Sequence, residues 1–493
     1  MPAAGSTLEE VSRRVGGRVM GDPATWLTDV THDSTSAGPD VLFVALRGAQ
    51  HDGHDFVEAA VSSGSPAVAV DHPLPVPVSQ LVVDDTRSVL GAMAAQVHND
   101  PSTQVAVVGV TGTNGKTTVT HYIESILGTA GRTAGLIGTV QTRVGTDVVP
   151  SVRTTPEATD FQRLLAQMRE LGAEVIAAEI SSHALEMNRV ASTRFAVAAF
   201  TNLSQDHLDF HGTMDDYRAA KERLFREYEV GTAVLNVDDE VGSEIASWAT
   251  MPTILVGSQG SVRAENVQTS FDGTRFDLVT PDATTAVSSN LVGVFNVENA
   301  LVAVGCCLAL GLSLDQIVDG LGALKGVPGR FEQVSGRGPV HVVVDYAHTP
   351  DGVHQAIRAS RAISDGRIIA VVGAGGDRDR DKRPLMGRAA GEADVAVLTS
   401  DNPRSEDPDR ILDDLASGLP RGSSILEVDR RLAIEKAIAL AKSGDVVLIL
   451  GKGHETGQEI GGQVLPFDDR DVAREILRAG ASSPEIRPDS GSM

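Results

Sequence analysis

Residues 104–131 read QVAVVGVTGTNGKTTVTHYIESILGTAG, an apolar run followed by a glycine-containing loop and a segment of helical character. A fully buried strand reads as a continuous apolar run of this kind. Glycines let backbone N–H groups turn inward around phosphate oxygens, and the N-terminus of the following helix adds positive potential. The stretch therefore predicts a strand, a phosphate-binding loop and a helix that together bind a nucleoside triphosphate.

Two side chains of the loop GTNGKTT have expected roles. Lys116 would contact the outer phosphates, and the hydroxyl of Thr117 would hold Mg²⁺. The spacing departs from the common G-x-x-x-x-G-K-[ST] pattern, because Val110 stands where that pattern has its first glycine. A chance match to GKT is the competing interpretation, and the strand and helix around the loop argue against it.

The rest of the chain forms three sections around this stretch. Residues 1–98 hold short apolar runs and a proline-rich loop, residues 99–335 hold the phosphate loop and further apolar runs, and residues 336–493 alternate strands and helices. Such alternation predicts a parallel, doubly wound sheet. We expect an α/β protein of three domains, with a polar, disordered tail after Ala481.

Composition argues against several classes of partner. The 493 residues include 42 basic and 66 acidic side chains, a net charge of −24, whereas surfaces that bind nucleic acid or anionic membranes are basic. The two cysteines, Cys306 and Cys307, cannot form a disulfide framework or a four-ligand zinc site. We find no signal-peptide pattern and no apolar run of roughly 18 residues. We expect a cytoplasmic protein with no nucleic-acid or membrane partner.

Lysine is scarce, since seven lysines stand beside 35 arginines among the 42 basic residues. Codon bias explains the ratio of lysine to arginine, but the scarcity of lysine makes the position of each one worth inspecting. Lys221 lies on the apolar stripe of a predicted helix, four residues after Tyr217 and four before Phe225. Either the flexible side chain of Lys221 extends far enough for its amine to reach solvent, or the amine is buried. Burial would lower its pKa and give a neutral amine that can react. Such an amine reacts with CO₂ to give a carbamate, an anionic metal ligand that arginine cannot form.

Two further candidates for a metal site lie in the same section. Glu179 stands near the end of the apolar run EVIAAEI, and His207 lies in TNLSQDHLDFHG after another such run. Each alone is more often structural. Their position at strand ends beside a phosphate loop favours a metal role, because Mg²⁺ prefers carboxylate oxygens and keeps several waters.

Three polar loops follow three apolar runs in the last section: GAGGDRDRDKRP, DNPRSEDP and GKGHETGQ. Because parallel sheets bind ligands at the carboxyl ends of their strands, we expect these loops to converge on one cleft. An arginine fork and acidic side chains suit a zwitterion, whereas solvated loops are the alternative. The loops supply Arg378, Asp401, Asn402, Arg404, Gly451, Lys452, His454 and Glu455.

Taken in order, the motifs resemble the Mur ligase family. They are GTNGKTT, RTTPEA, EISSHAL, NLSQDHLDFHG, YRAAKERLF, GVFNVENA, PGRFE, VDYAHTP, GGDRDRDKRPLMG, DNPR and GKGHE. The resemblance implies a small N-terminal α/β domain for a UDP-linked substrate, a central P-loop ATPase and a C-terminal Rossmann-like domain for an amino acid. It implies ATP-dependent amide formation with Mg²⁺ through an acyl phosphate, in the synthesis of peptidoglycan precursors.

Within the family, the chain is most similar to members that join meso-2,6-diaminopimelate to UDP-N-acetylmuramoyl-L-alanyl-D-glutamate. DNPR carries this choice, because Arg404 offers a fork for the second carboxylate of diaminopimelate, which lysine lacks. The alternatives are a ligase that adds L-lysine, a folylpolyglutamate-type ligase, or a nucleotide-binding regulator without catalysis. We expect a monomer.

The resemblance also implies roles for individual residues. The catalytic positions are Lys116, Glu179, His207 and Lys221. The metal positions are Thr117, Glu179, His207 and Lys221, the last as N6-carboxylysine. The ATP positions are Gly112, Thr113, Asn114, Gly115, Lys116, Thr117, Thr118, Asn299, Arg330 and Asp345. The positions for the UDP-linked substrate are Ser34, Ala49, Gln50, His51, Thr154, Thr155, Ser181 and Arg189. The diaminopimelate positions are Arg378, Asp401, Asn402, Pro403, Arg404, Gly451 and Glu455.

The chain departs from the family pattern at two substrate positions. Thr35 stands where the family often has an arginine, and Met187 stands where it often has a glutamine. Neither contact is carried over.

Overall fold

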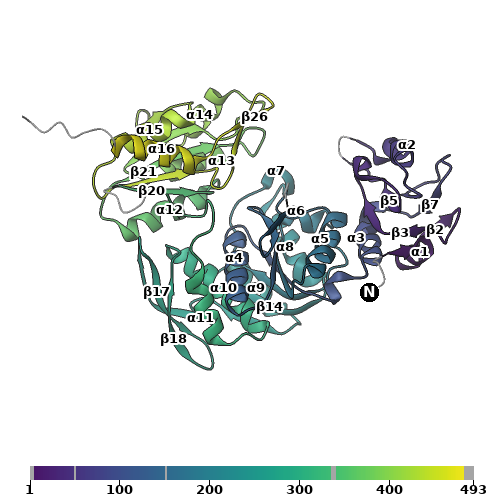
Figure 1. Ribbon diagram of the computed structural model, residues 1–493. Helices are drawn as coiled ribbons and strands as arrows, with labels where there is room; N and C mark the ends of the chain where they lie inside the picture. Colours follow the sequence, from purple (N-terminus) through teal and green to yellow (C-terminus); the bar gives the residue numbers. More distant parts are fainter. Residues whose placement is uncertain (1–4, 49–50, 150–152, 335–339, 482–493) are drawn as a thin grey trace, which may run out of the picture.

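The computed structural model describes residues 5–48, 51–149, 153–334 and 340–481. Three α/β units follow one another along the chain, each built on one main sheet (Figure 1). This confirms the predicted fold class. The proposed boundary at 335/336 and the tail after Ala481 lie outside the described residues, and the boundary at 98/99 stays a prediction.

The N-terminal unit is a five-stranded sheet in the order β2-β7-β6-β5-β4, parallel except for β2 at one edge. The strands are β2 (Arg18–Met20), β4 (Asp29–Thr31), β5 (Val41–Val44), β6 (Ala67–Val70) and β7 (Ser79–Val82), and a short pair joins β1 (Ser6–Thr7) to β3 (Trp26–Leu27). The helices are α1 (Leu8–Val15), α2 (Val57–Ser62) and α3 (Thr86–Val97), with the 3-10 turns η1 (Ser34–Ser36), η2 (Gly53–Phe56) and η3 (Pro101–Thr103).

The central unit is an eight-stranded sheet in the order β11-β10-β9-β12-β8-β13-β14-β15, parallel from β9 to β15. The strands are β8 (Ala106–Thr111), β9 (Ala134–Ile137), β10 (Thr142–Val144), β11 (Asp147–Val149), β12 (Val175–Glu179), β13 (Phe195–Phe200), β14 (Val230–Asn236) and β15 (Thr253–Val256). The helices are α4 (Lys116–Thr129), α5 (Ala158–Glu170), α6 (Ser182–Glu186), α7 (Leu208–His211), α8 (Met214–Arg226), α9 (Glu240–Trp248), α10 (Val294–Ala309) and α11 (Leu314–Ala323).

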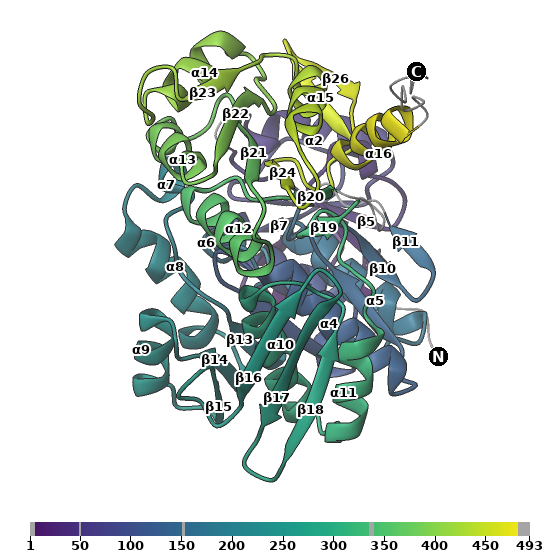
Figure 2. The ribbon, with the colours of Figure 1, turned by 90° about the vertical axis from the view of Figure 1, so that its left-hand side faces the viewer.

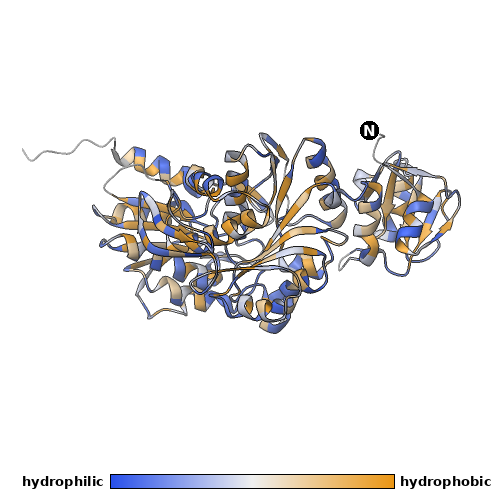
Figure 3. Ribbon diagram, turned by 90° about the horizontal axis from the view of Figure 1, so that it is seen from below, coloured by the Kyte–Doolittle hydropathy of each residue, from blue (hydrophilic) through white to orange (hydrophobic). Residues whose placement is uncertain are grey.

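The apolar runs of this unit became strands that are buried on both faces. Side chains alternate across a strand, so neighbouring residues enter different cores. Val108 and Val110 pack with α4, α10 and α11 in one core, while Val107 lies in the other core with residues of α5, α8 and α9. Figure 3 shows hydrophobic colours along these strands and hydrophilic colours on the outer faces of the helices. Burial on both faces explains why the runs were recognisable in the sequence.

A three-stranded antiparallel sheet was not predicted. It consists of β16 (Arg263–Ser270), β17 (Gly273–Val279) and β18 (Thr284–Ser289), which lie against α10 and α11 (Figure 2). Its outer face is exposed, and buried residues such as Phe276, Leu278 and Val287 alternate with polar ones. A half-buried strand of this kind lacks a continuous apolar run.

The C-terminal unit is a six-stranded sheet in the order β19-β20-β24-β21-β22-β23, parallel except for β19. The strands are β19 (Glu332–Gln333), β20 (His341–Asp345), β21 (Ile368–Ala374), β22 (Val395–Ser400), β23 (Ser424–Leu426) and β24 (Val446–Leu450), followed by the hairpin β25 (Gly457–Ile460) and β26 (Gln463–Pro466). The helices are α12 (Pro350–Ile363), α13 (Lys382–Ala390), α14 (Pro408–Ala416), α15 (Arg430–Leu440) and α16 (Asp469–Ala481). Cores on both faces confirm the doubly wound sheet.

Polar contacts join the N-terminal unit to the central one. Asp29 of β4 accepts hydrogen bonds from Arg163 of α5 at 2.8 and 3.0 Å, and Arg163 also donates to the carbonyl of Val30 at 2.8 Å. His32 and Thr159 form a further hydrogen bond of 3.0 Å. Within the described residues, no helix is long and apolar enough to cross a membrane.

A buried ion pair ties the C-terminal unit together. The guanidinium of Arg430 donates to both carboxylate oxygens of Asp469 at 2.8 and 2.7 Å, and neither side chain is exposed. The same guanidinium donates to the carbonyls of Ser400 and Leu450, at the ends of β22 and β24. Arg430 thus links the N-termini of α15 and α16 to the ends of β22 and β24.

We predict that Asp469→Ala lowers the free energy of unfolding by about 3–5 kcal/mol, because it leaves a buried guanidinium without its counterion. Urea unfolding of the full chain measures this. The matched control is Arg431→Ala, which breaks an exposed pair with Glu475 at 2.8 Å and is worth less than about 1 kcal/mol. Equal losses in the two variants would contradict the prediction.

Candidate active site

Two adjoining cavities lie between the central and C-terminal units. The first, of about 420 Å³, is lined by the phosphate loop, by the ends of β12 and β13, and by residues of the C-terminal unit. The second, of about 370 Å³, is lined by the polar loops after β21, β22 and β24. Four residues line both cavities and form a shared wall: Asp206, His207, Tyr346 and His348.

The phosphate loop has no room for side chains at two glycines. Gly112 and Gly115 have φ of +143° and +87°, which L-residues rarely adopt. A Cβ at Gly112 would lie 1.9 Å from the hydroxyl of Thr201, and one at Gly115 would lie 2.1 Å from the amide oxygen of Asn299. Asn299, an expected ATP position, therefore packs directly against the loop. Thr113, Asn114, Lys116, Thr117 and Thr118 line the first cavity with it.

Two lysines donate to one carbonyl of this loop. The ammonium of Lys116 lies 2.8 Å from the carbonyl oxygens of Gly112 and Thr113, and that of Lys221 lies 2.8 Å from the same Gly112 oxygen. Lys221 is 1% exposed and stands over the ring of Tyr217, so it does not reach solvent. Burial lowers the pKa of both lysines, and the nearby charge of Lys116 lowers that of Lys221 further.

Helix α8 holds Lys221 in this position. Thr213 caps the helix, accepting a hydrogen bond from the backbone of Asp216 at 3.1 Å. The hydroxyl groups of Tyr217 and of Thr113 in the loop form a hydrogen bond of 3.1 Å. The predicted apolar stripe faces the sheet, and the lysine within it faces the loop.

Glu179 ends β12 and is 1% exposed. Its carboxylate accepts hydrogen bonds from the hydroxyl of Thr117 at 3.0 Å and from the backbone and hydroxyl of Thr139 at 2.8 and 2.9 Å. The Thr117 oxygen also accepts a hydrogen bond of 2.9 Å from Arg330. Hydrogen bonds thus join three predicted site residues directly: Thr117, Glu179 and Arg330.

His207 follows β13 with φ of +56°, and its ring lies 3.3 Å from the carboxylate of Asp206. Burial lowers the pKa of His207 despite this carboxylate. Burial would raise the pKa of Asp206, but His348, His207 and Lys382 nearby lower it. His348 and Lys382 each approach Asp206 at 3.8 Å. Asp206, His348 and Lys382 lie in motifs of the family, but the motifs alone predict no role for them.

The predicted metal residues do not form one tight cluster. Glu179, His207 and Thr117 line the same cavity, whereas Lys221 lies beneath the loop and is not part of that lining. A loose set is compatible with Mg²⁺, which keeps several of its waters. In the described parts of the chain, the cluster of three His, Cys, Asp or Glu ligand atoms within 4.8 Å lies elsewhere, at His54, Asp71 and His72.

Residues of the C-terminal unit reach the phosphate loop. Asp345 at the end of β20 accepts hydrogen bonds from the backbone of Phe331 and Ala347 at 2.6 and 2.9 Å. Burial raises its pKa, which Arg330 opposes. Asp351 at the start of α12 accepts a hydrogen bond of 3.2 Å from Asn114 of the loop. This last contact was not predicted, because nothing in either motif indicates its partner.

The residues expected to hold the UDP-linked substrate fall into two groups. One group adjoins Glu179: the hydroxyl of Thr155 donates to its carbonyl at 2.7 Å, and Ser181, Thr154 and Arg189 lie within hydrogen-bonding distance of Thr155 or Thr139. The other group, Ser34 and His51, belongs to the N-terminal unit, and Ala49 and Gln50 lie outside the described residues.

The three polar loops of the C-terminal unit converge as predicted. Arg378, Asp401, Asn402, Arg404, Gly451 and Glu455 line the second cavity, whereas Pro403, Lys452 and His454 do not. Lys452 is fully buried beneath the cavity and donates to Asn402 at 2.9 Å and to Glu455 at 2.8 Å. Arg404 has φ of +52° and donates to the carbonyl of Gly376 at 2.6 Å.

Comparison with known proteins shows which family the chain resembles. The chain matches "Mur ligase family, catalytic domain" over residues 27–110, "Mur ligase middle domain" over 110–307 and "Mur ligase, glutamate ligase domain" over 329–453. UDP-N-acetylmuramoyl-L-alanyl-D-glutamate–2,6-diaminopimelate ligases are similar to it. The enzyme from Aquifex aeolicus is 45% identical over 91% of this chain and 93% of its own length. That from Streptomyces coelicolor is 44% identical over 93% and 94%.

A solved structure of a protein with the same name superposes with a TM-score of 0.68 at 32% identity, over 97% of this chain and all of that one. Identity above 40% across nine-tenths of the chain, together with a phosphate loop that opens onto a second polar cavity, leads to one conclusion. The chain belongs to the Mur ligase family.

Proposed function

We propose that this protein is an ATP-dependent ligase that joins meso-2,6-diaminopimelate to UDP-N-acetylmuramoyl-L-alanyl-D-glutamate in peptidoglycan precursor synthesis. One observation supports it most: the cavity at the phosphate loop and the cavity of the polar loops share a wall. A carboxylate activated in the first would meet an amine held in the second. The relatives named above carry this activity in their names.

ATP and Mg²⁺ fit the residues of the first cavity. The ammonium of Lys116 lies against two carbonyls of the loop and lines the cavity, where its positive charge would favour a phosphate group. Backbone N–H groups of 112–118 would bind the β- and γ-phosphates, with Asn299, Arg330 and Asp345 around the nucleotide. Thr117, Glu179, His207 and a carbamylated Lys221 would hold Mg²⁺, which neutralises phosphate charge when bound.

The proposed reaction has two steps. The γ-carboxylate of the D-glutamyl residue attacks the γ-phosphorus, the bond to the β,γ-bridging oxygen breaks, and ADP leaves. The neutral amine of diaminopimelate then attacks the acyl carbon and phosphate leaves, with one proton lost from the nitrogen. Lys116 stabilises the charge on the phosphoryl oxygens, and the loop backbone orients them in line.

The second cavity would bind the amino acid through charge pairing. Arg404 would form two parallel hydrogen bonds to the distal carboxylate, and Arg378 would bind a carboxylate as well. Asp401 and Glu455 would accept the ammonium groups. Lys452 donates to Glu455 and to Asn402 and thereby holds both side chains in place.

The remaining partners follow from this activity. Thr154, Thr155, Ser181 and Arg189 would contact the peptide and muramoyl end of the UDP-linked substrate, and Ser34 and the 49–51 stretch its uridine end. We infer a cytoplasmic monomer without nucleic-acid or membrane partners, since both substrates are small molecules and the chain carries a net charge of −24.

The first test is ADP release with the UDP-linked dipeptide and a panel of amino acids. We expect turnover only with both substrates present and most with meso-diaminopimelate. Faster turnover with L-lysine would reject the choice of amino acid. Hydrolysis of ATP that ignores every amino acid would reject the ligase activity itself.

Lys221→Ala is expected to lose more than about 100-fold in kcat, because the carbamate would help to hold the Mg²⁺ ion that neutralises phosphate charge. Acetate is expected to restore part of the activity, since its carboxylate can stand where the carbamate would be. The matched control is Lys436→Ala, which changes an exposed lysine paired with Glu427. Full activity in Lys221→Ala would reject the role.

Arg404→Ala is expected to raise KM for diaminopimelate by about ten- to a hundredfold, the equivalent of one charged hydrogen bond of roughly 1.5–3 kcal/mol. KM for ATP should stay unchanged. Arg410→Ala, at an exposed arginine on α14, serves as the control. Equal increases in both KM values would point to a general loss of structure.

A further inference from the structure

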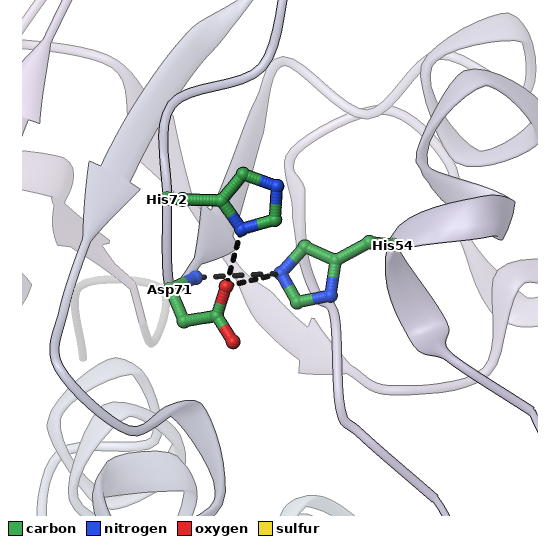
Figure 4. Close-up of side chains that lie close together, drawn as sticks. All are labelled: His54, Asp71 and His72. Atoms are coloured by element: carbon green, nitrogen blue, oxygen red, sulfur yellow. Dashed lines mark hydrogen bonds and ion pairs between the residues drawn. The ribbon is translucent and has the colours of Figure 1, made fainter.

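A cluster of two histidines and a carboxylate lies in the N-terminal unit, away from both cavities. His54, Asp71 and His72 offer three ligand atoms that lie within 4.8 Å of one another. Figure 4 shows both imidazole rings turned toward the same carboxylate. One oxygen of Asp71 lies 2.5 Å from Nδ1 of His72 and 3.2 Å from Nε2 of His54.

The fold places this cluster at the carboxyl ends of two adjacent parallel strands. Asp71 and His72 follow β6 directly, and His54 lies in η2, in the connection that leaves β5. Ligands of parallel sheets bind at such ends. Gly53 fixes the connection, because a Cβ there would lie 2.4 Å from the backbone nitrogen of Leu46.

Asp52 determines which nitrogen of His54 faces the cluster. Its carboxylate lies 2.6 Å from Nδ1 of His54 and accepts the backbone N–H of His54 at 3.0 Å. This contact favours the proton on Nδ1, so that in the neutral imidazole the lone pair lies on Nε2. The backbone N–H of Asp71 points to that Nε2 at 3.4 Å, which agrees with an acceptor. A carboxylate behind a ligand histidine is the usual outer partner in metal sites.

The ligand atoms of the cluster lie close enough together for one ion to take the place of the protons between them. Nε2 of His54 lies 3.2 Å and Nδ1 of His72 lies 2.5 Å from the same oxygen of Asp71. Nε of Arg47 donates to the other oxygen of Asp71 at 2.6 Å, and Nη2 of Arg47 donates to the shared oxygen at 3.2 Å. The exposed guanidinium therefore holds Asp71 in place, and a bound ion would compete with its longer hydrogen bond to the shared oxygen.

We propose that His54, Asp71 and His72 bind one divalent transition-metal ion of the zinc class, with water in the fourth position. Imidazole nitrogens favour zinc, nickel and copper over Mg²⁺, which prefers oxygen ligands. Bonds of about 2.0–2.2 Å to a tetrahedral ion fit the 3.2 Å spacing of His54 and Asp71. His72 is half exposed, so its ring can move outward to admit the ion.

Metal binding to the full chain tests the proposal, with Co²⁺ as a spectroscopic probe and Zn²⁺ as its competitor, without nucleotide. We expect one equivalent of Co²⁺ with the visible absorption of a four-coordinate ion, displaced by Zn²⁺. His72→Ala and Asp71→Asn should weaken binding at least tenfold. Glu179→Gln should leave the signal unchanged, which separates this site from the active site.

A matched control is His354→Ala, because His354 pairs with Glu392 at 2.7 Å outside the cluster. It should bind Co²⁺ like the unchanged chain. His72→Ala alters a half-exposed side chain, so its circular dichroism and unfolding midpoint should match the unchanged chain. No saturable binding at micromolar metal above neutral pH would overturn the proposal and leave a cluster that shares a proton. Binding that survives both His72→Ala and Asp71→Asn would overturn it as well.

Discussion

Two lysine amines meet at the carbonyl oxygen of Gly112, and much of the active site depends on that contact. Burial and the neighbouring Lys116 lower the pKa of Lys221, which suits the amine that is proposed to react with CO₂. The contact needs Gly112 to have no side chain and needs α8 to present a lysine from its buried face. It also needs β8 and β13 to be neighbours, since Thr201 at the end of β13 packs against the loop.

The active site is shared between two units that are each built on their own main sheet. Arg330 reaches Thr117 and Asp351 reaches Asn114, while the shared wall combines Asp206 and His207 of the central unit with Tyr346 and His348 of the C-terminal one. An acyl phosphate is destroyed by water. Packing of one unit over the other can complete the site and exclude solvent at once.

The sequence predicted the parallel sheets because their strands are buried on both faces and read as apolar runs. It missed β16 to β18 and the hairpin β25–β26, whose strands bury one face or neither. It also left open whether Lys221 reaches solvent, because an apolar stripe does not reveal what lies opposite. The partner, Gly112, is 109 residues away in the chain. The grouping of Asp206, His348 and Lys382 was missed for the same reason, because these residues lie far apart in the sequence and meet only in the fold.

The joint between the N-terminal and central units has a consequence for specificity. It combines hydrogen bonds, such as those of Arg163 with Asp29 and Val30 and of His32 with Thr159, with a small apolar contact in which Ala158 of α5 joins the core of the N-terminal unit. Interfaces between units that are not large and hydrophobic permit relative motion. In the proposed reaction, the nucleotide end and the reacting end of one long substrate would bind on opposite sides of this joint. Relative motion at this joint would then set the distance between the sites that bind the two ends of the substrate. A change in that distance would alter which substrates fit, while phosphoryl transfer would stay intact.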